Sequence, residues 1–88
     1  MKEYLLQEEY ENIKELVDYA LNAANKNEAE IHIRKIQSYG YGLMSRANNI
    51  LNELVAYVKD ASGRVSDKER RIYAVNSKLY ELETYGVK

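Results

Sequence analysis

His32 is the only histidine in the chain and the first residue to consider as a metal ligand. Glu28 stands four residues before it and would share its helix face, so the pair could supply two metal ligands. A di-iron helical bundle instead uses the spacing Glu-x-x-His, and Ala29 occupies the position of that glutamate. Because no second copy of the pattern occurs, the sequence predicts a solvated surface histidine and no metal site.

The sequence contains no complete set of residues for nucleophilic catalysis. There is no cysteine, and the serines have no second histidine to activate them. The stretch Gly40-Tyr41-Gly42 superficially resembles a phosphate-binding loop, but no Gly-Lys-Ser/Thr sequence follows it. Carboxylates recur on the polar faces of predicted helices, where solvation is their ordinary role. We therefore expect a protein that is not an enzyme and that uses no cofactor.

One segment, residues 63–80, is basic and interleaved with aromatic residues. Tyr73 and Tyr80 stand seven residues apart on one helix face, and the cations around them could contact nucleic-acid phosphates. These cations are Arg64, Lys68, Arg70, Arg71 and Lys78. The turn of a helix-turn-helix motif is missing, and Asp67 and Glu69 dilute the positive charge. Nucleic-acid binding is therefore an alternative hypothesis, and a solvated helix face is the interpretation we prefer.

The charge of the chain is unevenly divided. Residues 1–30 carry eight acidic and three basic side chains, a balance of −5, so the rest carries +4 of the net charge of −1. Glu8, Glu11 and Glu15 lie on the first predicted helix and could steer the protein toward a basic partner. The same residues could equally serve solubility alone.

The chain has nine tyrosines and neither phenylalanine nor tryptophan. Tyrosine buries its ring while its hydroxyl stays in water, which suits protein interfaces. Tyr39 and Tyr41 flank Gly40 and fall outside the apolar row, so we predict that the two tyrosines point outward and form a protein-binding surface around Gly40. The alternative is that the two tyrosines cover the edge of the first helix.

Apolar periodicity predicts an all-α fold in a single domain. The absence of proline and the presence of only four glycines in 88 residues favour the same class. We expect a three-helix antiparallel bundle, with helices over residues 3–24, 28–62 and 67–85 joined by short loops. The long central helix is predicted because apolar spacings of 4 and 3 continue through Gly40 without a change of phase. A break at residues 39–42, which would give four short helices, is the alternative.

Loop residues indicate where the predicted helices begin and end. Asn25 can adopt the left-handed conformation that ends the first helix, and Asn27 with Glu30 can form a capping box for the second. Gly63 suits the left-handed position after the second helix. Ser66 can begin a capping box for the third.

From Met44 onward, the predicted long helix carries a second apolar row, which continues with Leu51, Val55 and Val58. A single partner helix cannot cover two rows, so part of this surface stays open unless a second chain covers it. We therefore expect a homodimer that forms a larger helical bundle.

The functional expectation follows by elimination. The first residues are rich in carboxylates, and no run approaches the ~20 apolar residues of a membrane span, so we expect a cytoplasmic protein without membrane contact. We expect a small regulator or inhibitor that docks a helical surface onto a larger protein. The alternatives are a nucleic-acid-binding protein and a purely structural subunit that associates with itself. The abundance of Lys, Asn, Ile and Tyr is common among accessory proteins of phages and mobile elements in AT-rich bacteria.

Overall fold

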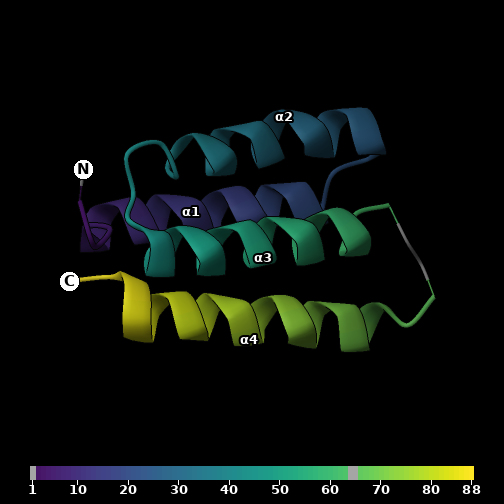
Figure 1. Ribbon diagram of the computed structural model, residues 1–88. Coiled ribbons are helices and arrows are strands. Elements are labelled where there is room, and N and C mark those ends of the chain that lie inside the picture. Colours follow the sequence, from purple (N-terminus) through teal and green to yellow (C-terminus); the bar gives the residue numbers. More distant parts are fainter. Residues whose placement is uncertain (1, 64–65) are drawn as a thin grey trace.

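Four helices account for most of the chain in the computed structural model, which describes residues 2–63 and 66–88. They are α1 (Gln7–Leu21), α2 (Lys26–Ser38), α3 (Ser45–Ala61) and α4 (Lys68–Gly86). Successive helices run antiparallel, and the described residues contain no strand beyond two isolated bridges (Figure 1). The predicted all-α class is therefore confirmed, and the predicted number of helices, three, is wrong.

α3 is the central helix. α2 and α4 lie on opposite sides of it, and α1 packs against α2 and α3 (Figure 1). Apolar residues at helical spacing face inward from all four helices. The largest side chains that are less than 2% exposed are Leu5, Ile13, Ile33, Ile36, Leu51, Leu54, Val58, Val75 and Leu82. Each of them contributes about 1.5–3 kcal/mol by leaving water, so their burial is the main term that stabilises the bundle.

The predicted helix over residues 28–62 is wrong, because the chain turns at residues 39–44 between α2 and α3. Gly42 adopts a left-handed φ of +77°, which costs a residue with a side chain about 1–2 kcal/mol. Gly40 lies close to other groups: a Cβ atom there would lie 2.7 Å from Oδ1 of Asn48, so a side chain at this position would displace that of Asn48. Both glycines serve a turn, and the alternative of a break near them is correct.

The unbroken apolar spacing has a simple cause. Ser45, the first residue of α3, stands one heptad after Ser38, the last residue of α2. Both helices face the same core, and the turn between them buries Leu43. A turn of this length therefore preserves the phase as well as a continuous helix does.

The first residues form an extended segment, here termed the N-terminal strap (residues 2–6), where we expected the first turn of a helix from residue 3. Its backbone joins the α2–α3 turn to the end of α4. The bonds that do so are Lys2 N–H to Gly42 O (2.9 Å), Met44 N–H to Lys2 O (2.7 Å), Leu5 N–H to Gly86 O (2.7 Å) and Lys88 N–H to Leu5 O (3.0 Å). The Leu5 side chain is 0% exposed, so the strap is also held by its burial in the core.

α1 begins directly after the strap, where the Glu9 carboxylate binds two strap residues. It accepts a hydrogen bond from the Leu6 N–H (2.9 Å) and pairs with the Lys2 ammonium group. Partial burial acts to raise the pKa of this carboxyl, but the bonds to Leu6 and Lys2 outweigh it and hold the pKa below its ordinary value. The charged carboxylate therefore fixes the start of α1 against the strap.

Three of the predicted helix caps are wrong, and the one at Gly63 is correct. Asn25 does not end the first helix: its side chain accepts a backbone N–H from the first turn of α2 (2.9 Å) and caps that helix, ahead of the expected Asn27 cap. The capping box expected at Ser66 is absent, because α4 follows Asp67, whose φ is +53°. Gly63 has a φ of +74° and adopts the left-handed conformation, as predicted.

The second apolar row, which motivated the predicted homodimer, is mostly covered within one chain. Leu51, Val55 and Val58 are buried within one chain, because α4, α2 and α1 all pack against α3. Met44, the first residue of the predicted second row, lies at the turn and is 40% exposed. One chain therefore covers most of its apolar rows without a second copy.

We predict that alanine substitution destabilises the protein strongly at one leucine of the strap and hardly at the other. Leu5→Ala removes a fully buried side chain and should lower the free energy of unfolding by about 2–5 kcal/mol. Leu6→Ala should change it by no more than about 0.5 kcal/mol, because the Leu6 side chain is 60% exposed. Urea denaturation followed by circular dichroism measures both. A destabilisation by Leu6→Ala larger than that by Leu5→Ala would contradict the strap, because a helix from residue 3 would place Leu6 on the apolar row of Tyr10 and Ile13.

Candidate protein-binding surface

The acidic residues of α1 lie along its solvent side. The acidic face, as it is termed below, comprises Glu8, Glu11, Glu15 and Asp18, all of them exposed. Glu11 is engaged within its own helix, with Gln7 (2.8 Å) and Lys14 (4.0 Å). The carboxylates of the other three form no hydrogen bond or ion pair with any residue that the structure describes. Three negative charges of the acidic face are therefore available to a partner.

A groove of about 350 Å³ between α1 and α2 brings two of the predicted site residues together. Glu15 and Tyr39 both line it, with Leu16, Tyr19 and Lys35 beside them. The Tyr39 side chain is half-buried and packs against the core. Its position agrees with the alternative that it covers the edge of the first helix.

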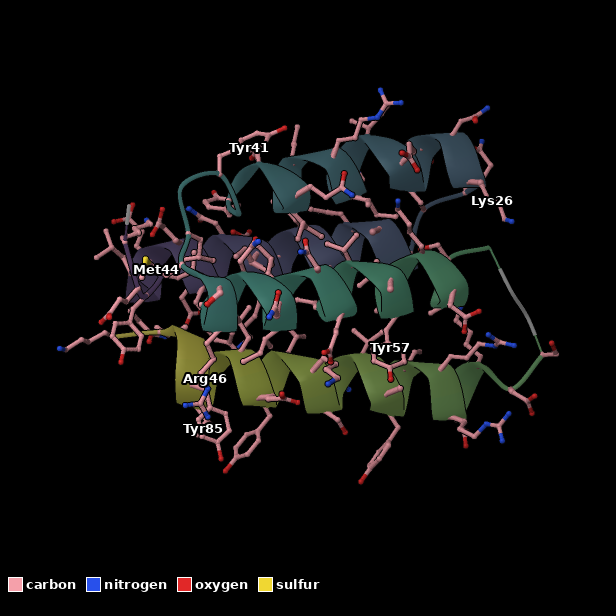
Figure 2. The ribbon with its side chains drawn as sticks, in the orientation of Figure 1. Lys26, Tyr41, Met44, Arg46, Tyr57 and Tyr85 are labelled. Carbon is pink, nitrogen blue, oxygen red and sulfur yellow. The ribbon has the colours of Figure 1, made fainter. Side chains whose placement is uncertain are left out.

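The remaining residues of the predicted tyrosine surface lie in the α2–α3 turn. Tyr41 is 84% exposed and points away from the bundle beyond the end of α2 (Figure 2). Gly40 is half-buried, with the Asn48 side chain close to it. The predicted pair of tyrosines is thus divided: Tyr39 lies in the groove and Tyr41 lies in solvent.

A stacked contact between Tyr19 and His32 was not predicted. The two ring centroids are 5.4 Å apart and the rings are inclined by 29°. His32 is half-buried, which differs from the expected solvated position, and its Nδ1 atom is buried without a hydrogen-bond partner in the described residues. Glu28 accepts the Ala24 N–H (3.0 Å). Among the described residues, no three His, Cys, Asp or Glu side chains are placed to hold a metal ion.

Two cations of the predicted basic segment connect α4 to α3. Arg71 pairs with Asp60, and Lys78 pairs with Glu53. Lys78 also donates to Glu81 on its own helix (3.0 Å). The hydrogen bonds to Glu53 and then Glu81 raise the pKa of Lys78 above its ordinary value. These two cations therefore serve the contact between helices.

The other residues of the basic segment are exposed or lie outside the described residues. Arg70 is exposed and lies 3.5 Å from the Asp67 carboxylate, while Lys68 is exposed on the first turn of α4. Tyr73 and Tyr80 are 74% and 70% exposed, as their shared helix face predicted. Arg64 lies outside the residues that the structure describes. The described cations that could contact phosphates are thus divided between ion pairs with α3 and exposed positions on α4.

A second unpredicted group of apolar side chains gathers at the strap end of the bundle. Tyr4, Leu6, Met44 and Tyr85 are each at least 39% exposed, and the Arg46 guanidinium lies 4.4 Å from the Tyr85 ring centroid. Figure 2 shows Met44, Arg46 and Tyr85 at this same end. Periodicity could not reveal the group, because the strap brings its members together.

Tyr10 fastens α1 to α4. Its hydroxyl group donates a hydrogen bond to the Leu79 carbonyl oxygen (3.1 Å), and the side chain is 3% exposed. Burial, followed by the nearby carboxylates of Glu83 and Glu11, raises the pKa of Tyr10 to about 12. This bond fixes the helix that carries the acidic face.

Comparison with known proteins gives no match: no family model, curated protein or solved structure is similar to the chain. None of the helices formed by the described residues combines the length and the apolar character that a membrane span requires.

Tyr10→Phe should lower the free energy of unfolding by about 1 kcal/mol at neutral pH, because it removes one buried hydrogen bond. The pKa of Tyr10 is about 12 in the folded chain, above the value of about 10 for an unfolded one, so its stabilising effect is complete below pH 10 and is lost as the pH rises through 12. Urea denaturation across this range should show the wild type losing its advantage over the variant. A constant difference from neutral pH to pH 12 would contradict the buried hydroxyl.

Proposed function

We propose that this protein is a non-enzymatic binding protein that docks the acidic face of α1 onto a basic surface of a larger protein and regulates or inhibits it. The observation that carries the proposal is that the carboxylates of Glu8, Glu15 and Asp18 are exposed and form no ion pair or hydrogen bond with any described residue. Charges that are not neutralised internally remain free to attract a basic partner and to select against an acidic one.

The surroundings of the acidic face support protein binding. Glu15 shares a groove with Tyr19 and Tyr39, so a carboxylate and two aromatic rings are presented together. Tyrosine is enriched in protein interfaces because its ring adds apolar contact while its hydroxyl group forms a hydrogen bond with water or with a polar group of the partner. The rigid helix beneath keeps these groups in place at little entropic cost on binding.

We propose a non-enzymatic role because the described residues include no serine hydroxyl that is hydrogen-bonded to a histidine. The single histidine is stacked on Tyr19 and has no hydrogen bond at Nδ1 to a serine or carboxylate of the described residues. A general base needs such a partner within hydrogen-bond reach.

The test begins with a partner identified by cross-linking in the native host and then purified. Neutralising the acidic face with Glu8→Gln, Glu15→Gln and Asp18→Asn should weaken the affinity by about tenfold at low salt and reduce its dependence on salt. Isothermal titration calorimetry measures the affinity, and circular dichroism should show unchanged helicity.

The matched control carries Glu3→Gln, Asp67→Asn and Glu69→Gln, which removes the same charge from exposed positions outside α1. Its affinity should stay within about twofold of the wild type, because these residues lie on the strap and at the start of α4 and not on the acidic face. An equal loss in both variants would mean that only net charge matters. An unchanged affinity of the variant with the neutralised acidic face would show that this face is not part of the interface.

A further inference from the structure

A second groove, between α1 and α4, has a volume of about 560 Å³. Its floor is apolar and consists of Val17 and Leu21 from α1 with Ile72 and Leu79 from α4. Val17 and Leu79 are buried, whereas Leu21 and Ile72 are half-buried and keep part of their apolar surface in contact with solvent. The groove therefore offers a shallow apolar strip between two helices.

The groove exists because α1 and α4 both flank the core of the bundle but stay apart from one another over most of their length. They meet where the Tyr10 hydroxyl group binds the Leu79 carbonyl. From Leu79 to Lys68 the groove follows α4 for about 16 Å, at 1.5 Å per residue, which is about three helical turns. An added helix of this length would have a helix on each side and an apolar floor beneath it.

The rim of the groove is unequally charged. Its charged residues are Glu11, Lys14, Glu15 and Asp18 on α1 and Lys68 on α4. Lys14 lies 4.0 Å from the Glu11 carboxylate, so these two charges offset one another. Glu15 and Asp18 have no such cation among the described residues. The α1 side of the groove is therefore negative, and the α4 side carries one positive charge.

We infer that this groove binds a basic amphipathic helix of the partner, an inference that rests on the proposed function and names the element that the acidic face recognises. The apolar side of that helix packs on Leu21 and Ile72, and its lysines or arginines lie toward Glu15 and Asp18. Helices recognised in grooves use this division between an apolar stripe and a charged flank. A helix with carboxylates on that flank would meet Glu15 and Asp18 and is disfavoured.

A synthetic peptide serves as the probe. It has about 18 residues, or about 27 Å of helix, with leucines on one face and lysines and arginines on the other. Titrated into isotope-labelled protein, it should shift the NMR signals of Leu21, Ile72 and Asn76 and leave those of Tyr73 and Tyr80 on the outer face of α4 unchanged. A second peptide with glutamate at each cationic position should bind at least about tenfold more weakly.

Neighbouring residues of α4 provide a matched pair of variants. Asn76 and Ser77 are both exposed, but only Asn76 lines the groove. Asn76→Trp fills the groove and should weaken binding of the basic peptide by about tenfold, whereas Ser77→Trp should change it by no more than about twofold. Circular dichroism and urea denaturation confirm that both variants remain folded.

Each other outcome overturns the inference. Absent binding, equal binding of the acidic peptide, or binding that Asn76→Trp leaves unchanged would exclude a basic helix in the groove. A dimer in sedimentation that Asn76→Trp dissociates would show that a second copy of the chain occupies it. The proposed function fails separately: it falls if the purified partner still binds the chain with a neutralised acidic face, whatever the peptide does.

Discussion

The N-terminal strap holds together the end of the bundle where three distant pieces of backbone meet. Its hydrogen bonds link residues 2 and 5 to the α2–α3 turn and to the last residues of the chain. Each such bond contributes only about 0.5–1.5 kcal/mol net, so the bonds alone would hold the strap weakly. Leu5, which is fully buried, adds the burial of a complete leucine side chain. Because Glu9 binds Leu6 and Lys2 of the strap, the same segment determines where α1 begins.

The position of α1 in turn determines what the surface presents. Tyr10 fastens α1 to α4 at the strap end, and beyond this bond the two helices separate into the α1–α4 groove. The acidic face thus lies between two grooves, with Glu15 at the edge of both. One carboxylate is therefore placed beside aromatic rings on one side and an aliphatic floor on the other. The proposed basic partner uses this juxtaposition.

The sequence was sufficient for those features that depend on local spacing. Apolar residues such as Ile13, Ile33 and Leu54 are buried as their periodicity indicated, and Gly63 takes the left-handed conformation. The break between α2 and α3 could not be decided from phase, because Ser38 and Ser45 are one heptad apart. The strap could not be predicted either, since its bonds join residues near opposite ends of the chain. Without knowledge of those bonds, the apolar residues Leu5 and Leu6 fit the first turn of a helix as well as they fit an extended segment.

The candidate site likewise combines features that local spacing predicts with features that depend on how the helices pack. Exposure of Glu8, Glu11 and Glu15 follows from the helical pattern, but the grooves beside them depend on how far α1 stands from α2 and α4. The basic segment was harder to interpret, because a cation on a helix face can bind a partner or a neighbouring helix. Arg71 and Lys78 bind carboxylates on α3, which only the packing of α4 reveals.

Amide hydrogen exchange measured by NMR tests the strap most directly. The amides of Leu5, Met44 and Lys88 each donate one of its hydrogen bonds, and they should be protected at a level comparable with the helices. The Tyr4 amide donates no hydrogen bond to a described backbone group and should exchange rapidly. Exchange at Leu5 and Lys88 as fast as at Tyr4 would contradict the strap, and with it the fixed start of α1 on which the placement of the acidic face depends.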